Sequence, residues 1–228
     1  MEPVGTVQGS VLSPLLGNIY LHYVLDRWFA TEVKPRLRGK TTLLRYCDDF
    51  IIGFEREEDA RRVRVVLEKR LKRFGLTLHP DKTRLLPFWR PPTTQQSGQG
   101  PATFDFVGFT FYWRRTRTGH WRMGCKTRRA SLRRAKQALY DWCRRHRHQS
   151  VEAQHAALSR RLRGHFNYFG VHGNFQSLLQ LVGATKRAWY KWLCRRSQRK
   201  RLTWERFTDF LRQRPLPRPR IMVRIWSG

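Results

Sequence analysis

Acidic residues are scarce in this chain of 228 residues. It contains 16 Asp and Glu against 47 Lys and Arg, which gives a formal net charge of +31. Positive charge of that size repels itself, so we expect an anionic partner that neutralises it. Arg outnumbers Lys 37 to 10, and planar guanidinium groups favour bidentate contact with phosphate and stacking on bases. The composition therefore favours nucleic acid over a membrane surface as the partner.

Long apolar runs and paired cysteines are also missing. No run approaches the roughly 18 residues that a membrane-spanning helix needs, and the start MEPVGTVQGS has neither the basic nor the apolar region of a signal peptide. The four cysteines include no C-x-x-C pair, which argues against a disulfide framework or a zinc ribbon. Cys143, His146 and His148 have nearly metal-binding spacing but no second half, so solvated helix residues explain them better. We expect no membrane partner and a location inside the cell, in a bacterial-like cytoplasm or alternatively an organelle.

Charge divides the chain into two parts. Residues 1–110 carry 17 basic and 12 acidic side chains, whereas residues 111–228 carry 30 and 4. This contrast predicts different tasks for the two halves. With 40% hydrophobic residues, the chain can bury a real core, and disorder is not expected.

The first half has the periodicity of a mixed α/β region. A helix of about four turns is expected from Ser13 as N-cap and Pro14 as first helical residue. Its predicted apolar face carries Leu15, Ile19, Tyr23 and Phe29. Residues 43–54 predict two short strands. A second helix is expected from Glu57 to a stop at Gly75, and its apolar stripe is Val63, Leu67, Leu71 and Phe74.

The later part of this half predicts more extended structure. Residues 76–88 are expected to be extended and broken at Pro80, and the Pro/Gly/Gln-rich residues 91–103 to form a loop. The alternating stretch FDFVGFTFYW predicts one strand, with a hairpin completed through Thr118-Gly119.

The second half predicts a small bundle of helices with Arg-covered outer faces. Ser150 is the expected N-cap of its second helix, and a shorter last helix begins near Thr203. The alternating prolines of RPLPRPRI end that helix in an extended tail. The predicted core positions are Leu132, Ala135, Leu139, Trp142, Val151, His155, Leu158, Leu162, Phe166, Phe169, Phe175, Leu178, Val182, Trp189, Trp192, Trp204, Phe207 and Leu211.

Asp48 and Asp49 interrupt the apolar stretch LLRYCDDFIIGF. Two adjacent carboxylates at a hairpin bend repel each other unless a cation lies between them and their neighbours. Hard oxygen ligands suit Mg²⁺, and a pair of such ions serves phosphoryl transfer. The alternative is that both residues are ordinary turn residues with their side chains in water.

Four stretches of the sequence, in a fixed order, show a resemblance to a known family that includes Asp48 and Asp49. TVQGSVLSPLLGNIYL, YCDD, GLTLHPDKT and FVGFTF closely resemble the palm of reverse transcriptases encoded by group II introns. LRGHFNYFGVHGN and LTWERFTDFLRQRPLPRPRI are similar to the maturase-specific region of that family, domain X, which forms the thumb. The resemblance covers essentially the whole chain. It implies an α+β fold, with part of a polymerase palm (a β-hairpin and sheet with packed helices) in residues 1–125 and an α-helical thumb/maturase bundle in residues 126–228.

The resemblance also implies roles at matching positions. Asp48 and Asp49 would be the catalytic carboxylates that hold two Mg²⁺ ions, or Mn²⁺ as an alternative. Tyr46 and Cys47, where the family more often has Ala, would lie beside the primer terminus. The remaining nucleotide- or template-binding positions would be Gln8, Gly9 and Lys82, although a solvated strand-edge lysine would explain Lys82 equally well. The strand with Val107, Gly108 and Phe109 would be the primer grip, although its alternating Phe residues would also suit a core.

The basic half would bind structured intron RNA and the duplex of RNA template and DNA primer, with dNTPs as substrates. Solvated surface arginines are the plainer explanation, but the 30 to 4 charge ratio with interleaved aromatics argues against it. The expected RNA-binding residues are Arg128, Arg129, Arg133, Arg134, Arg160, Arg161, Arg163, Lys186 and Arg187.

This sequence departs from the family pattern in one important respect. The family uses a third aspartate from an earlier palm strand, and that strand and the fingers belong before Met1. Asp26, Asp81 and Asp105 lie in segments of other types and do not match it. We therefore expect inefficient polymerisation by these residues alone, unless an upstream polypeptide supplies the rest. Because the 228 residues include no Cys/His-rich endonuclease module, we expect any cleavage of target DNA to require another component.

Two other functions stay open at this point. One is a non-catalytic RNA-binding maturase that promotes intron folding and splicing. The other is a decayed remnant of such a gene, which poor folding of the chain would favour, because a palm without its upstream strands exposes a sheet edge.

Overall fold

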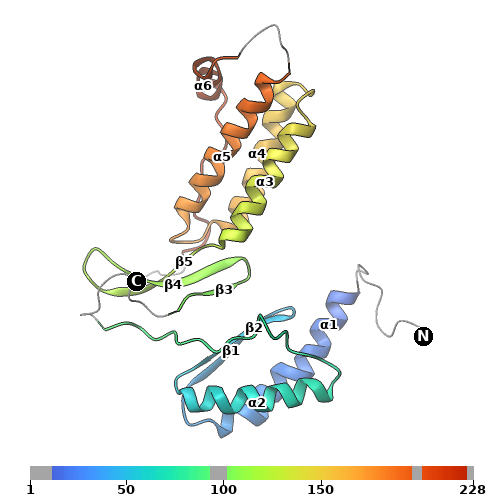
Figure 1. Ribbon diagram of the computed structural model, residues 1–228, viewed down its shortest axis with the longest axis vertical. Helices are drawn as coiled ribbons and strands as arrows, with labels where there is room; N and C mark the ends of the chain where they lie inside the picture. Colours follow the sequence, from blue (N-terminus) through green and yellow to red (C-terminus); the bar gives the residue numbers. More distant parts are fainter. Residues whose placement is uncertain (1–11, 93–101, 197–201, 225–228) are drawn as a thin grey trace. The chain divides into compact units, whose positions relative to one another are not determined.

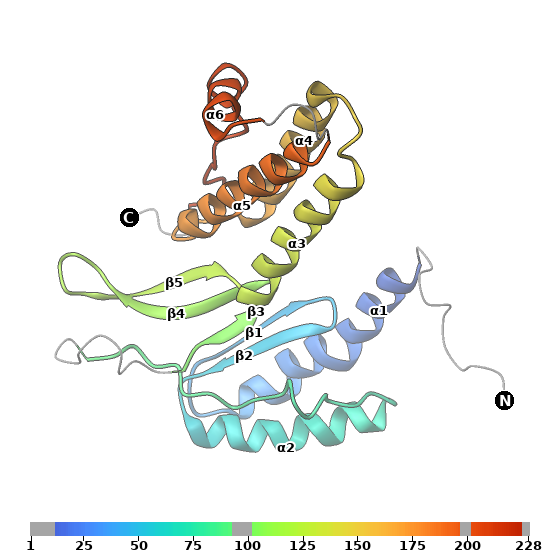
Figure 2. The ribbon, with the colours of Figure 1, turned by 45° about the horizontal axis from the view of Figure 1, so that its top comes forward.

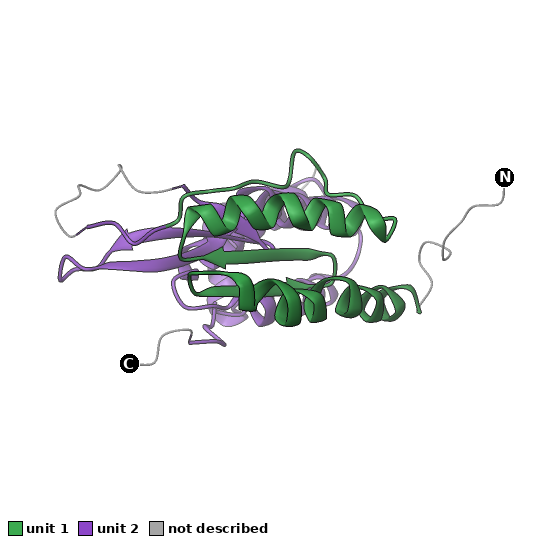
Figure 3. Ribbon diagram, turned by 90° about the horizontal axis from the view of Figure 1, so that it is seen from below, with its two compact units in different colours: residues 1–88 green, residues 89–228 purple. Residues whose placement is uncertain are grey.

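The computed structural model describes residues 12–92, 102–196 and 202–224. The described residues form two compact units, one that ends at Phe88 and one that begins at Trp89 (Figure 3). Gln8, Gly9 and most of the expected loop at 91–103 lie outside the described residues. The functional boundary expected between residues 125 and 126 stays a prediction.

The first unit opens with a helical segment that changes its winding. The α-helix α1 (Ser13–Leu21) continues as two π-helical turns, η1 (His22–Arg27) and η2 (Phe29–Val33), and ends as the 3₁₀ turn η3 (Lys34–Arg36). Its N-cap is Leu12 with no side-chain cap, so the expected cap at Ser13 is wrong.

The buried face of this helical segment also differs from the expected one. Of the four predicted positions only Phe29 is buried, whereas Leu15, Ile19 and Tyr23 are exposed. The buried residues are Val24, Leu25, Trp28, Phe29 and Val33. Leu15 and Ile19 lie in α1, which has no buried residue. From His22 onward the reason is the winding, because a π-helical turn accommodates more residues than an α-helical turn and shifts the face that later residues occupy.

A two-stranded hairpin completes this unit together with helix α2 (Glu57–Arg73). Strands β1 (Thr41–Tyr46) and β2 (Asp49–Phe54) pair antiparallel from Thr41 opposite Phe54 to Tyr46 opposite Asp49. The helices lie on one face of the hairpin (Figure 2). The core between them contains Val24, Leu25, Trp28, Phe29, Val33, Val63, Leu67 and Leu71. The predicted strands and the predicted stripe of the second helix are confirmed.

Helix α2 begins and ends as its sequence predicts. Three acidic residues occupy its first turn, where the helix dipole favours negative charge. One of them, Asp59, is buried and accepts hydrogen bonds from the backbone N–H groups of Arg38 and Gly39 at 3.1 and 2.9 Å. The helix ends before Gly75, whose φ of 70° favours glycine. Residues 76–88 contain no assigned strand, with a turn at Pro80.

The second unit starts with a three-stranded antiparallel sheet in the order β3 (Phe104–Phe106), β4 (Phe109–Arg115) and β5 (Trp121–Thr127). The single strand expected over FDFVGFTFYW is therefore wrong, because a tight turn at Val107 and Gly108 splits it into β3 and β4. Both turn residues have positive φ, 47° and 79°, the signature of a two-residue hairpin turn. The expected second hairpin is confirmed, since β4 pairs with β5.

Helices form the rest of the described part of this unit (Figure 1). They are α3 (Arg129–Arg145), α4 (Val151–Phe169), α5 (Phe175–Cys194) and α6 (Trp204–Gln213). Ser150 and Thr203 cap α4 and α6 through their side chains, as predicted for Ser150. The shared core contains Leu132, Leu139, Trp142, Cys143, Leu158, Leu162, Phe166, Leu178, Leu181, Val182, Ala188, Trp189, Trp192, Phe207, Leu211 and Leu216.

Hydrogen bonds from a buried asparagine join this sheet to this bundle. The Oδ1 atom of Asn174 accepts from the backbone N–H of Thr127 at 2.7 Å and lies 3.1 Å from its hydroxyl. The Nδ2 atom of Asn174 donates to the carbonyl of Phe169 at 2.8 Å. The end of β5 is therefore held next to the junction between α4 and α5.

The α+β fold class is confirmed. Within the described ranges, none of the helices has the length and apolar character needed to cross a membrane.

We expect acid to destabilise the second unit because of one partly buried histidine. Burial lowers the pKa of His165 from its ordinary 6.5 to about 4, and its ring stacks on Phe169 at 4.5 Å. The native state excludes the proton that the unfolded state accepts, so the free energy of unfolding should fall from pH 6.5 to about 4 and then level off. The full loss is up to about 3 kcal/mol.

The measurement is urea unfolding at pH 7 and pH 4.5 for the wild type and His165→Phe, which keeps the stacked ring but cannot titrate. We expect the variant to lose less stability on acidification. His148→Gln, at an exposed position, is the matched control. Equal acid sensitivity of the wild type and His165→Phe would contradict the assignment.

Candidate active site and nucleic-acid interface

Asp48 and Asp49 lie at the tip of the β1–β2 hairpin. Tyr46 pairs with Asp49, so Cys47 and Asp48 alone form the turn. Cys47 has a φ of 55°, the left-handed region that a two-residue hairpin turn requires at its first position. Both carboxylates are exposed. Neither one makes a hydrogen bond or ion pair to another residue within the described ranges.

The two faces of this hairpin differ. Leu43 and Arg45 are partly buried on the face that the helices cover, whereas Leu44 and Tyr46 are 57% and 58% exposed. Residues directly opposite in an antiparallel pair share a face, so Asp49 lies on the outer face with Tyr46. A carboxylate and a phenol are thus presented together on the open side of the hairpin.

Arg45 holds the turn from the inner face. Its Nε and Nη2 atoms donate to the two carboxylate oxygens of Asp26 at 2.8 and 2.6 Å. Its Nη1 donates to Asn18 Oδ1 at 2.8 Å and to the carbonyl of Cys47 at 2.9 Å. The hydrogen bond from Arg45 holds the pKa of Asp26 below its ordinary 3.8, so the pair is ionised at neutral pH. The sequence reasoning missed Arg45, Asn18 and Asp26 as members of this site.

The other expected nucleotide-binding residue of this unit lies in a turn. Lys82 follows Pro80, is exposed, and donates its backbone N–H to the carbonyl of His79 at 3.2 Å. Within the described ranges no hydrogen bond or ion pair joins its side chain to Asp48 or Asp49. The structure thus places Lys82 in a turn, and neither the strand edge nor contact with the aspartates is observed.

Val107, Gly108 and Phe109, the expected primer grip, form a turn in the second unit. Tyr168 donates its hydroxyl to the carbonyl of Val107 at 3.0 Å, and Phe109 stacks on Tyr168 at 6.0 Å. A Cβ on Gly108 would lie 3.4 Å from the ring of Phe169, at a φ of 79°. This turn is therefore fixed against the end of helix α4, although a β-branched residue such as Val107 rarely adopts positive φ.

The expected RNA-binding residues are spread over three helices. All are exposed except Lys186, which is partly buried. Two have additional contacts within the fold: Arg128 pairs with Asp105 at 2.9 Å, and Arg161 lies over the ring of Trp142 at 5.4 Å. Arg133 and Arg187 come together at a groove between α3 and α5.

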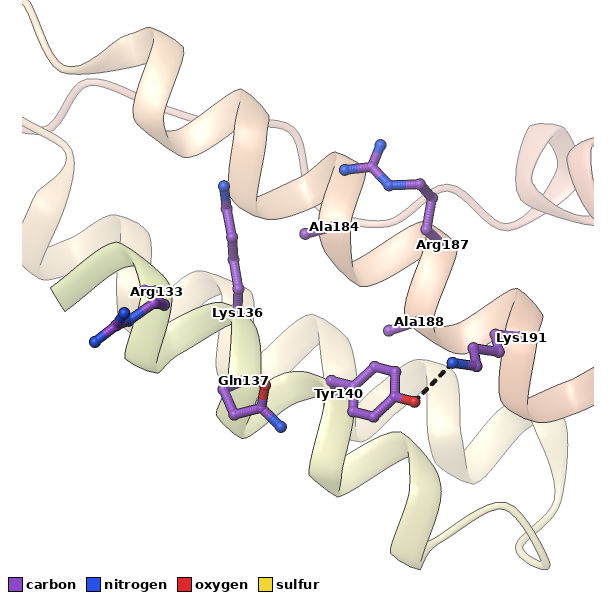
Figure 4. A pocket seen from close by; sticks show the side chains of 8 residues that line it. All are labelled: Arg133, Lys136, Gln137, Tyr140, Ala184, Arg187, Ala188 and Lys191. Carbon is purple, nitrogen blue, oxygen red and sulfur yellow. Dashed lines mark hydrogen bonds between the residues drawn. The ribbon is translucent and has the colours of Figure 1, made fainter. Parts of the chain in front are cut away.

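This groove, which we call the α3/α5 groove, is lined entirely by cationic, neutral polar and small residues (Figure 4). Its lining residues are Arg133, Lys136, Gln137, Tyr140, Ala184, Arg187, Ala188 and Lys191. Lys191 donates to the hydroxyl of Tyr140 at 2.8 Å. No carboxylate lines the groove, so its four cations concentrate positive charge on one surface. Lys136 and Lys191 were missed because only the pairing of α3 with α5 brings them together.

Beyond the groove, cations surround one buried indole. Arg144, Arg147 and Arg195 lie 5.9, 6.0 and 5.2 Å from the centre of the Trp192 ring. Arg144 lies in the last turn of α3, and Arg147 and Arg195 follow the ends of α3 and α5, so their exposed charged ends extend the basic surface at the ends of these two helices. Cys143, by contrast, is fully buried and its pKa is raised to about 12 by burial, and His146 stacks on Trp142 at 4.6 Å. Within the described ranges no three His, Cys, Asp or Glu side chains form a group that could hold a metal ion.

The comparisons with known proteins bear on the first half of the chain. No curated protein matches the sequence. One family model matches, that of the reverse transcriptase (RNA-dependent DNA polymerase). It spans residues 2–111 and so includes the hairpin with Asp48 and Asp49. Residues 2–111 are thus similar in sequence to the reverse transcriptase (RNA-dependent DNA polymerase) domain.

Proposed function

We propose that this protein is a reverse transcriptase/maturase of the group II intron type. Its reaction is RNA-templated DNA synthesis, in which a primer 3′-OH attacks an incoming dNTP and pyrophosphate leaves. The observation that carries the proposal is the exposed carboxylate pair at a tight hairpin turn, inside the residues that match the reverse transcriptase model.

The donor chemistry of the turn fits magnesium. Mg²⁺ in such enzymes is held by one or two carboxylates together with substrate phosphates, and both carboxylates are exposed and make no bond to another described residue. When bound there, Mg²⁺ or Mn²⁺ would neutralise charge that develops on the reacting phosphate. Since no third acidic residue joins the pair within the described ranges, the proposal includes an upstream polypeptide that supplies one.

Other residues of the first unit have roles in substrate binding under this proposal. Tyr46 shares the outer face of the hairpin with Asp49, so its ring is the surface against which the primer terminus lies. Cys47 brings the backbone round the turn. Gln8 and Gly9 contact the template and the incoming nucleotide, and Lys82 supplies a cation for the nucleotide phosphates.

The second unit binds the nucleic acid under the same proposal. The α3/α5 groove presents four cations and no carboxylate, which suits the phosphate backbone of structured RNA or of the template–primer duplex. The Val107–Phe109 turn, fixed by Tyr168, is the primer grip.

A second function is favoured by the groove itself. Its lining residues all belong to α3 and α5, so phosphate binding there requires nothing from the hairpin. A maturase that binds intron RNA and promotes splicing, without polymerisation, would use this surface alone. The two functions differ in whether Asp48 and Asp49 matter.

Primer extension on an RNA template tests the proposal. The purified chain is assayed with dNTPs and Mg²⁺, alone and together with an upstream reverse transcriptase polypeptide that supplies the third aspartate, and RNA binding is measured on the same samples. Each outcome is judged with and without that polypeptide. Extension that disappears in Asp48→Asn/Asp49→Asn supports the polymerase. No extension with tight, salt-sensitive RNA binding supports the maturase, and the absence of both activities overturns the two functions together.

Removing charge from the α3/α5 groove should flatten the salt dependence of RNA binding. Arg133→Gln/Arg187→Gln removes two phosphate contacts, so the slope of log K against log salt should become less steep by roughly 1.5. Binding should weaken similarly for unrelated RNA sequences, because phosphate contacts carry no sequence information. The measurement is fluorescence anisotropy with labelled RNA at several salt concentrations.

The control for the groove variant removes equal charge elsewhere. Arg62 and Arg64 are exposed on α2, outside the groove, so Arg62→Gln/Arg64→Gln lowers the net charge by the same amount. Equal slopes in the two double variants would show that binding follows net charge, and the role of the groove would be wrong.

A further inference from the structure

The turn that carries the aspartates needs support beyond its own hydrogen bonds. It joins only two strands, and the first turn residue, Cys47, is held at a φ of 55°. Residues other than glycine persist in this region when the surroundings hold them there. Cys47 and Asp48 are both exposed, so packing of their side chains supplies little of that support.

The carbonyl of Cys47 receives a hydrogen bond from the guanidinium of Arg45 at 2.9 Å. This carbonyl belongs to the peptide that joins Cys47 to Asp48. A hydrogen bond to it therefore fixes the orientation of that peptide plane, and with it the backbone position of Asp48. The Arg45 side chain is only 13% exposed. The guanidinium is therefore largely enclosed, although the carbonyl that it contacts belongs to the exposed Cys47.

Two residues in turn fix the plane of the guanidinium. The carboxylate of Asp26 accepts hydrogen bonds from Nε and Nη2 of Arg45 at 2.8 and 2.6 Å. Asp26 directly follows Leu25, which is fully buried. Asn18 accepts from Nη1 at 2.8 Å and is itself tied to helix α1 through the carbonyl of Pro14 at 3.0 Å. The amide of Asn18 also lies 3.9 Å from the sulfur of Cys47.

We propose that Arg45 is a positioning residue that holds the Cys47–Asp48 peptide through Asp26 and Asn18, so that Asp48 and Asp49 present their carboxylates to a divalent cation. This inference rests on the proposed function, because it takes the two aspartates as the metal-holding groups. Only arginine can do this here, since its planar fork serves a bidentate carboxylate and two further acceptors at once. A lysine would keep the charge but lose that geometry.

A purely structural ion pair is the competing explanation. Such a pair would stabilise the first unit without affecting how the turn binds a cation. The two explanations separate in Arg45→Lys at a temperature where both proteins are fully folded by circular dichroism. Mn²⁺ is the probe, because its paramagnetism broadens signals of nearby residues.

The experiment is a Mn²⁺ titration followed by NMR on the full chain, read at the amide signals of the hairpin turn. Arg45→Lys should weaken Mn²⁺ binding at the turn by about tenfold or more, the usual effect of losing a group that orients metal ligands. Asn18→Ala leaves the Arg45–Asp26 pair intact and should weaken binding in the same direction by less. If Arg45→Lys fails to fold, the effect of Asn18→Ala on Mn²⁺ binding still tests the proposal. Arg61→Lys, at the exposed pair with Glu57, is the matched control and should have no effect.

The outcomes separate this inference from the proposed function. Unchanged Mn²⁺ affinity in Arg45→Lys and Asn18→Ala, with binding lost in Asp48→Asn/Asp49→Asn, overturns the role of Arg45 and leaves the metal site standing. A wild-type turn that binds no Mn²⁺ overturns both. Weakened binding in the first two variants together with loss in the aspartate variant supports both.

Discussion

Replacing Asp48 or Asp49 with asparagine is expected to lower the rate of primer extension by on the order of 10³-fold. Asparagine keeps the size of the side chain and removes its charge. A neutral amide cannot hold Mg²⁺ against the phosphates of a nucleotide as a carboxylate does. The loss corresponds to about 4 kcal/mol of transition-state stabilisation.

The same variants should bind RNA as tightly as the wild type or slightly more tightly. The chain carries a formal net charge of +31, and removing a negative charge from it does not oppose phosphate binding. Both aspartates are exposed, so their replacement removes no core contact and the free energy of unfolding should change little. Rate and binding are therefore expected to separate in one variant.

The matched control for this prediction is Glu58→Gln. Glu58 is also acidic and exposed, in the first turn of α2 in the same unit. It should leave extension within about twofold of the wild type. The assay is single-turnover extension at saturating RNA and primer, with the upstream polypeptide of the proposed function present and with the wild type and all variants in parallel. Extension that survives in both aspartate variants would show that the carboxylates of this hairpin do not hold the catalytic metal.

The sequence pattern predicted the buried residues best in elements where one regular period runs from end to end. Most predicted positions of α2, α3, α4 and α5 follow the α-helical period and are buried, such as Leu67, Leu139 and Leu162. The predictions at Phe175 and Trp204 are wrong, because each is the first residue of its helix and its side chain is 42% or 47% exposed, respectively. Ala135, Val151, His155 and Phe169 are partly buried. The pattern failed at residues 22–33, because π-helical winding changes the period within the segment. It also failed at Val107, where a β-branched residue occupies a turn that favours glycine or asparagine.

The candidate site shows the same limit. Asp48 and Asp49 are adjacent in the chain, so their pairing at a bend could be predicted from the sequence alone. Arg45 was not predicted, because its partners Asp26 and Asn18 belong to a helical segment 19 and 27 residues away. Lys136 and Lys191 likewise meet only through packing of α3 against α5. Pattern thus predicts groups that are contiguous, and misses those that tertiary contacts assemble.

Truncating Trp189 to alanine should destabilise the second unit by about 4 kcal/mol, within the range for buried aromatic side chains. Trp189 is fully buried, and its ring contacts Phe207 and Phe210 of α6 at 5.5 and 5.6 Å. These contacts join α5 to α6, so the cavity would open where two helices meet. Little relaxation is expected there, because residues on both sides belong to regular helices.

A hydrogen bond adds to the cost of losing Trp189. Its Nε1 donates to Gln154 Oε1 at 2.8 Å, and Gln154 is only 1% exposed. The amide of Gln154 in turn donates to the carbonyls of Arg147 and Gln149 at 3.3 and 2.8 Å. Without the indole, a buried acceptor is left unsatisfied, at a cost of about 1–3 kcal/mol.

Trp189→Phe separates the two contributions. Phenylalanine fills most of the cavity but donates no hydrogen bond, so it should cost about 2 kcal/mol, less than the alanine variant. Trp204→Ala is the matched control, since Trp204 is 47% exposed on α6 and should cost roughly 1 kcal/mol. Urea unfolding followed by circular dichroism gives all three values. Equal losses in Trp189→Ala and Trp204→Ala would show that Trp189 does not hold α5 to α6.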